Sequence, residues 1–224
     1  MTDKIRLEFV KNQDSIGVEL LSEERNVSEK FRISEDSFRE LFSGRFSTGY
    51  FFVSQDGPIY IEAKDGAKVV VVQRALRHNQ TIRWNQHGDV ENVSVTTPWS
   101  FFLFRLIPSG DNYVWQKQRL YVSSGPARGG ATPLFSAKFL GNVYDEGRNN
   151  ATNICWGNTA VTPGGLVSLA SLVNIANDFY SQTFTAHLER STQRWLDFTA
   201  TGKVPGESIF TLDTAIAEIW NNER

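Results

Sequence analysis

The sequence predicts an α+β fold in which an antiparallel β-meander is followed by C-terminal helices. Two observations lead to this fold class. Between positions 50 and 122, short runs of β-branched and aromatic residues alternate with turn residues, as in hairpin-connected strands. From position 166 onward, apolar residues recur at helical spacing. A chain of 224 residues, 40% of them hydrophobic, is long enough to bury such a core as one compact unit.

Five strands are expected in the meander, and residues that favour tight turns separate them. The strands cover residues 50–53, 59–63, 69–72, 99–106 and 113–122. The turn residues are Asp56-Gly57-Pro58, Asp65-Gly66, His87-Gly88 and Pro108-Ser109-Gly110-Asp111. Because strands joined by short connections pair in opposite directions, we expect an antiparallel sheet in the middle of the protein.

The N-terminal residues 1–47 are expected to form a strand and helix extension. Every second residue is apolar in 5–9 and again in 16–20, which predicts a hairpin of two half-buried strands. Ser34 is followed by two acidic residues, a pattern typical of a helix N-cap and first turn, so a short helix is expected there. We therefore divide the chain into this extension and a main domain over residues 48–224.

The C-terminal third is expected to be helical. Its apolar positions fall in three stretches: Leu166, Leu169, Val173, Ala176 and Tyr180; Trp195 and Phe198; and Leu212, Ala215, Ile216 and Ile219. The stripe over residues 166–184 has the spacing that packing against a sheet requires, and we expect it to be buried. Between sheet and helices, residues 132–165 are rich in Asn, Gly and Pro, and such irregular segments often carry functional sites.

Charge and hydropathy exclude several classes of partner. The 23 Lys and Arg residues balance 25 Asp and Glu residues, so the chain lacks the basic excess that drives binding to a phosphate backbone. Nucleic acid is not an expected partner. No apolar run reaches the roughly 18 to 20 residues of a membrane span, and the first residues are charged where a signal peptide is apolar. We expect a cytoplasmic protein with no membrane partner.

No cofactor or metal is expected from the motifs. The single cysteine, Cys155, excludes an internal disulfide framework and a cysteine-rich zinc site. The three histidines, His78, His87 and His187, do not have the spacing of metal ligands. The glycine-rich stretch 125–130 lacks the lysine that ends a phosphate-binding loop, and we interpret it as a connector.

A local basic group precedes Trp84. It consists of Arg74, Arg77, His78 and Arg83. Such a group could bind phosphate next to a stacking aromatic residue. Because the chain as a whole is slightly acidic, we interpret the group as a solvated sheet edge.

Cys155 is the strongest candidate nucleophile in the chain. It lies in the irregular segment, in Asn-Ile-Cys-Trp-Gly-Asn at 153–158. A thiol reacts as thiolate and needs either a lowered pKa or an activated partner such as a thioester. Two other interpretations stay open: a small buried hydrophobic residue, and a hydrolase pair with His187.

Three segments resemble the active-site region of ubiquitin-conjugating enzymes. They read Thr-Pro-Leu-Phe at 132–135, Asn-Val-Tyr-Asp-Glu-Gly at 142–147 and Asn-Ile-Cys-Trp-Gly-Asn at 153–158. Together with a fourth segment, Phe-Tyr-Ser-Gln-Thr-Phe-Thr-Ala-His at 179–187, they more closely resemble the prokaryotic ubiquitin-conjugating enzyme-like family D, which includes PRTRC system protein B. The resemblance covers roughly residues 49–220, and it implies a ubiquitin-conjugating-enzyme-like fold for the main domain.

The resemblance also implies a reaction and its partners. Cys155 would accept a ubiquitin-like protein as a thioester from an activating-enzyme-like protein and pass it to an amine. Asn142 would help stabilise the oxyanion of that transfer, and His187 would act as base for the incoming amine. The setting implied is a bacterial, plasmid or phage conjugation pathway.

The sequence departs from the family pattern at three places. Leu140-Gly141 stands where the best-known members have His-Pro, residues 148–153 lengthen the turn before the cysteine, and Ala186 shifts His187 by one position. Asn142 could instead tie a loop, and His187 could be a core or helix-end residue. We interpret Tyr144 and Trp156 as packing residues.

Two alternative functions stay open for the whole chain. One is a catalytically inactive binding module of the same fold, and the other is a structural or assembly protein of a mobile element. A transferase needs an accessible Cys155 thiol, whereas a binding module can bury it. The exposure of the Cys155 side chain therefore separates a transferase from a binding module.

Overall fold

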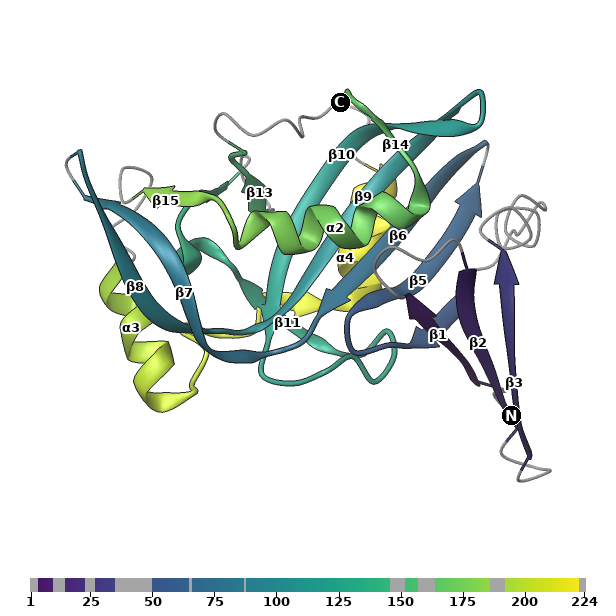
Figure 1. The fold of residues 1–224 in the computed structure, drawn as a ribbon, viewed down its shortest axis with the longest axis horizontal. Coiled ribbons are helices and arrows are strands. Elements are labelled where there is room, and N and C mark those ends of the chain that lie inside the picture. The colour runs from purple at the N-terminus through teal and green to yellow at the C-terminus, as the bar shows by residue number, and fades with distance from the viewer. Residues whose placement is uncertain are drawn as a thin grey trace.

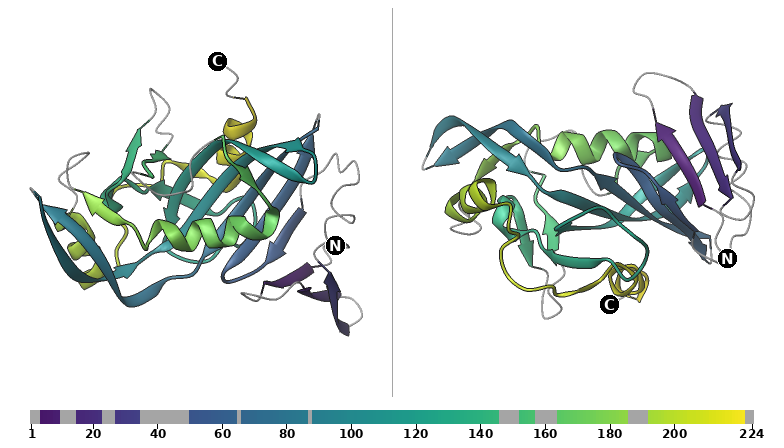
Figure 2. Two further views of the ribbon diagram at one scale, coloured as in Figure 1. Left: turned by 45° about the horizontal axis from the view of Figure 1, so that its top comes forward. Right: turned by 90° about the horizontal axis from the view of Figure 1, so that it is seen from below.

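A long, mostly antiparallel sheet runs through the molecule and carries helices on both of its faces (Figure 1). This computed structural model describes residues 4–9, 15–22, 27–34, 50–64, 66–86, 88–145, 152–156, 164–185 and 192–221. The predicted α+β class is confirmed, with the meander preceding the helices. Seen from below, helix α2 (Leu169–Phe179) and helix α4 (Leu212–Asn221) lie on opposite sides of the sheet (Figure 2).

All five predicted strands of the meander are present. They are β4 (Tyr50–Val53), β5 (Gly57–Lys64), β6 (Ala67–Arg74), β9 (Trp99–Ser109) and β10 (Asn112–Ser123). The central strands pair in the order β5, β6, β9 and β10. Residues 69–72 of β6 are at most 1% exposed, because both faces of this strand are covered. Such burial explains the continuous run of four valines.

A hairpin that the sequence analysis did not predict extends the two strands β6 and β9. It consists of β7 (Arg77–Gln86) and β8 (Asp89–Thr97), with Gln86 opposite Asp89 at its end. Of the side chains in β7, Ile82 and Trp84 are buried and most of the others are polar, so the apolar signal of this strand is weak.

The predicted solvated basic edge is only partly correct. Arg77, His78 and Arg83 are exposed on this hairpin. Arg74, at the end of β6, is 3% exposed and belongs to the interior. Its long side chain can be buried because side-chain oxygens of neighbouring elements accept hydrogen bonds from its guanidinium group.

The N-terminal strands continue the same sheet. The predicted hairpin is confirmed by β1 (Lys4–Phe9) and β2 (Ser15–Ser22), which pair with Leu7 opposite Val18. A third strand that was not predicted, β3 (Val27–Ser34), pairs with β2, and β1 pairs in parallel with β4. Ser34 ends this strand, and the rest of the helix predicted after it lies outside the described residues.

The described parts of the segment between sheet and helices form short elements. They are β11 (Pro133–Ser136), the 3-10 helix η1 (Lys138–Leu140), β12 (Val143–Asp145), β13 (Thr152–Ile154) and β14 (Leu166–Val167). Strand β14 pairs with the start of β10. Leu166 is 64% exposed there, so the prediction that the whole stripe from this residue is buried was wrong at its first position.

The three predicted helices are confirmed, with short strands between them. The remaining elements are β15 (Thr183–Thr185), α3 (Thr192–Thr201) and β16 (Phe210–Thr211). Helix α2 begins at Leu169 because Ser168 and Ser171 form a reciprocal capping box, with the Ser171 amide donating to the Ser168 hydroxyl at 3.1 Å. None of the described helices is long and apolar enough to cross a membrane.

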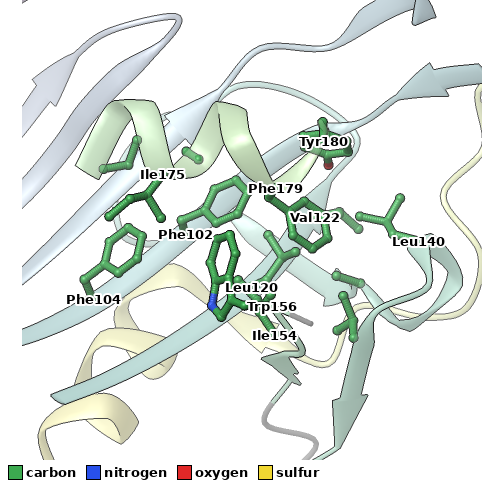
Figure 3. Packing of buried hydrophobic residues seen from close by; sticks show 14 of the residues in the cluster. Phe102, Phe104, Leu120, Val122, Leu140, Ile154, Trp156, Ile175, Phe179 and Tyr180 are labelled. Atoms are coloured by element: carbon green, nitrogen blue, oxygen red, sulfur yellow. The ribbon is translucent and has the colours of Figure 1, made fainter. Parts of the chain in front are cut away.

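Two hydrophobic clusters hold these layers together. The larger lies between the sheet and helices α2 and α3, and it is dominated by aromatic rings that meet edge to face (Figure 3). Phe179 of α2 contacts the rings of Phe102 and Phe184 at centroid distances of 5.7 and 5.3 Å. Such pairs stabilise a core by about 0.5–1.5 kcal/mol beyond the area they bury. The smaller cluster lies under α4.

The glycine-rich connector is shaped by helix α4. A methyl group at Gly130 would overlap the carboxylate of Asp213, in the first turn of that helix. We predict that Gly130→Ala lowers the free energy of unfolding by about 1–3 kcal/mol through this clash. Most of the loss should be recovered in the double variant with Asp213→Ala, measured by urea denaturation. Gly125→Ala is the control, since nothing lies within 4 Å of its added methyl group. Additive effects of the two substitutions would contradict this explanation.

Glu218 of α4 makes stability depend on pH. Burial raises the pKa of its carboxyl group, and Arg119 partly offsets this. The protonated form is therefore favoured in the folded state, so its contribution is present below the unfolded pKa and is lost as pH rises through the folded pKa. We predict that Glu218→Gln stabilises the protein at about pH 7 and has no such effect near about pH 4. Urea midpoints at both pH values test this, with exposed Glu207→Gln as control. An equal effect of Glu218→Gln at both pH values would contradict it.

Candidate functional site

The candidate site is built on the short hairpin of β12 and β13, which rests on strand β10. Val143 pairs with Ile154, and both side chains are buried against the larger cluster. Gln118 of β10 donates from Nε2 to the carbonyl oxygen of Ile154 at 3.0 Å. It also accepts from Nε1 of Trp156 at 2.7 Å. The same glutamine therefore holds the residues on both sides of Cys155.

Cys155 follows β13 and lies between two buried neighbours. Ile154 and Trp156 are 3% and 4% exposed, whereas Cys155 is half-buried. Figure 3 shows Ile154 and Trp156 within the aromatic cluster, close to Leu120 of β10. The anchored neighbours fix the backbone of Cys155, and the residue as a whole is partly exposed.

Asn142 precedes β12 and joins this hairpin to β15. Its backbone carbonyl accepts a hydrogen bond from the Cys155 amide at 2.8 Å. Its side chain donates from Nδ2 to the carbonyl oxygen of Thr183 at 2.9 Å and accepts at Oδ1 from the amide and hydroxyl of Thr185, at 3.1 and 3.2 Å. We call this set of side-chain bonds the Asn142 clasp. Asn142 therefore ties the loop before β12 to β15. Loop tying was one of the two roles that the sequence left open for this residue.

The backbone turn before β12 explains one departure from the family pattern. Gly141 has φ 72° and Asn142 has φ 49°, both in the left-handed region. Proline, with φ near about −65°, cannot adopt the conformation of Gly141. A methyl group at this position would also lie 3.3 Å from Cη2 of Trp84, so glycine suits both the turn and the close contact.

The residues predicted from sequence have different outcomes. The structure brings Cys155 and Asn142 together through a backbone hydrogen bond. His187 lies outside the described residues. Trp156 is a packing residue as predicted, whereas Tyr144 is 39% exposed, so the packing interpretation does not describe its whole side chain.

Thr185 was missed by the sequence analysis. It contributes two of the hydrogen bonds of the Asn142 clasp. Its only signal in the sequence is its place in the Phe-Thr pair of the fourth segment of the resemblance. A hydroxyl residue in a short strand is too common to identify a partner about 40 positions away without the fold.

Within the ranges that the structure describes, no group of three or more His, Cys, Asp and Glu residues could hold a metal ion. Comparisons of the chain with protein-family models, curated proteins and solved structures find no match. The family resemblance of the motifs therefore stays a prediction.

The Asn142 clasp should contribute measurably to stability. Glycine adopts the left-handed backbone without strain, so Asn142→Gly removes only the side-chain bonds, and we predict a loss of about 1–3 kcal/mol. Asn142→Ala should lose about 1 kcal/mol more, because alanine is strained in this conformation. Urea denaturation measures both losses.

Asn79 supplies the matched control for these variants. It also has a left-handed backbone, with φ 54°, and is exposed. Asn79→Gly should change the free energy of unfolding by less than about 0.5 kcal/mol. If Asn142→Gly were as harmless as this control, the clasp would not stabilise the fold.

Proposed function

We propose that Cys155 carries a ubiquitin-like modifier as a thioester, in a transferase with a ubiquitin-conjugating-enzyme-like fold. The half-exposed Cys155, held between two buried neighbours, is the observation that carries this proposal. A thiol that accepts an acyl group from another protein must be accessible, and its position must be fixed relative to that protein.

The order of the elements supports the finer part of the proposal. A meander is followed by a short hairpin, with Asn142 before its first strand and Cys155 after its second. This is the order in which the resembling segments occur in the ubiquitin-conjugating family. Helix α2 then follows and packs on the sheet.

The reaction would proceed by exchange of thioesters. The Cys155 thiolate attacks the carbonyl carbon of the modifier's thioester on an activating-enzyme-like protein. A new carbon–sulfur bond forms, the old one breaks, and the leaving thiolate takes the proton that Cys155 released. An amine of the acceptor then attacks the same carbonyl carbon. An amide bond forms, the bond to the Cys155 sulfur breaks, and the released thiolate takes up the proton that the amine loses.

Asn142 would act in this reaction mainly by position. Its Nδ2 group has two hydrogens, and one of them is used by the Thr183 carbonyl. The second hydrogen is the one that could stabilise the oxyanion formed at Cys155. Because the clasp holds the amide, this donor would need no reorganisation during transfer.

A binding module without covalent chemistry is the second candidate function. The observation that favours it is the clasp itself, because tying β15 accounts for Asn142 without any reaction. Such a module would use the same surface to hold a ubiquitin-like or activating-enzyme-like protein. The two functions differ in whether Cys155 forms a covalent bond.

Thiol labelling and thioester trapping distinguish the two functions. Since Cys155 is the only cysteine, iodoacetamide reports on this site alone. We predict native labelling at a rate within about tenfold of the denatured protein between about pH 6 and about pH 9. With a ubiquitin-like modifier and its activating enzyme, we predict an adduct that a reducing thiol cleaves.

Two variants complete this test. Cys155→Ser should form a more stable oxyester with the modifier, which a reducing thiol leaves intact, and Cys155→Ala should form no adduct. Labelling that occurs only after denaturation would overturn the transferase proposal. A labelled thiol that forms no adduct with any candidate pair would favour the binding module.

A further inference from the structure

Arg74 is a buried cation, and among the described residues its hydrogen-bond acceptors are neutral side chains. It is 3% exposed, and it donates to Oγ1 of Thr97 at 2.8 Å, to Oε1 of Gln80 at 3.3 Å and to Oδ1 of Asn177 at 3.3 Å. Its guanidinium also lies 4.1 Å from the centre of the Tyr180 ring. Burying a charge is costly, so a residue kept in this state calls for an explanation beyond general packing.

The three acceptors connect separate parts of the fold. Arg74 is the last residue of β6, at the point where the β6–β9 pair continues into the β7–β8 hairpin. Gln80 and Thr97 belong to the two strands of that hairpin, and Asn177 belongs to the last turn of α2. The planar guanidinium can hold all three at fixed angles, which a lysine ammonium group cannot do.

The helix end that Arg74 holds leads directly into the clasped strand. Tyr180 is the C-cap of α2, and only two residues separate it from Thr183, the first residue of β15. The Ser181 carbonyl between them accepts from Arg83 of β7 at 3.0 Å. Asn177 and Tyr180 place the guanidinium beside the C-terminal end of α2, the negative end of the helix dipole, which partly offsets the cost of burying the charge.

We propose that Arg74 is a positioning residue for the Cys155 site, because it sets where β15 begins and thereby where the Asn142 clasp holds the Cys155 backbone. The coupling runs from the Arg74 guanidinium to the Tyr180 ring, along the chain to Thr183, and through the Thr183 carbonyl to the Asn142 side chain. The Asn142 carbonyl then receives the Cys155 amide. The catalytic importance of Arg74 rests on the proposed function of Cys155. The structural coupling between Arg74 and the Asn142 clasp can be tested separately.

Amide hydrogen exchange tests the coupling without using the thiol. The reporters are the amides of Thr185 and Cys155, which donate to Oδ1 and to the carbonyl oxygen of Asn142. We expect Arg74→Met to lower the protection of both amides at least about tenfold more than that of amides in α4. Arg74→Lys should restore part of this protection, because it keeps the charge but not the planar fork.

Arg105 supplies a matched control on the other face of the sheet. It is also a buried arginine over an aromatic ring, with Trp220 at 5.8 Å, and it donates to the Trp220 carbonyl. Arg105→Met should destabilise the region of α4 without a selective effect on the two reporter amides. The loss of protection at the Thr185 and Cys155 amides is compared with the loss in free energy of unfolding for each variant. If the ratio were the same for Arg74→Met and Arg105→Met, Arg74 would be a general stabilising residue and the inference would be wrong.

A double-variant cycle tests the link to Cys155 reactivity. In the otherwise unchanged protein, Arg74→Met should raise the rate at which iodoacetamide labels Cys155 severalfold. In the Asn142→Gly variant, which lacks the clasp, adding Arg74→Met should change this rate by less than about twofold. Independent, multiplicative effects would overturn the inference while leaving the proposed function standing. Arg74→Met could lower the protection of the two reporter amides in a protein whose Cys155 forms no thioester. This result would support the inference and reject the transferase.

Discussion

Burial of the central strands on both faces is the constraint on which the rest of the structure depends. Strands β6, β9 and β10 lie between α2 on one side and α4 on the other. Apolar side chains satisfy this environment at most positions, but polar groups there must find partners within the protein. Gln118 and Arg74 are two such groups, and each binds an element that packs over the sheet.

The candidate site follows from the way these buried polar groups are satisfied. Gln118 fixes the chain on both sides of Cys155, and Arg74 fixes the end of α2. Asn142 connects the Cys155 segment to the strand that follows α2. Its carbonyl accepts a hydrogen bond from the Cys155 amide, and its side chain donates to Thr183 of β15. The half-buried Cys155 is therefore held in a framework in which Gln118, Arg74 and Asn142 each form hydrogen bonds to neighbouring elements, and such support favours precise positioning.

The sequence predicted the parts of the fold whose side chains alternate clearly. The meander strands, the first hairpin and the three C-terminal helices could be found because each repeats its apolar residues with one period. Strands β7 and β8 were missed because their outward side chains are polar and exposed in large part. Strand β3 was missed because the charged Glu29 stands between Val27 and Phe31 and interrupts the apolar alternation of this strand.

What the sequence determined by itself is the class of fold, the order of its elements and the identity of the one thiol, since composition, periodicity and motif order are local properties of the chain. Only the tertiary structure decided that Arg74 is interior, that Leu166 is exposed and that Thr185 meets Asn142. These facts depend on contacts between residues far apart in the chain. A side chain's burial and partners are set by which elements pack together, and no local pattern of residue types encodes that choice.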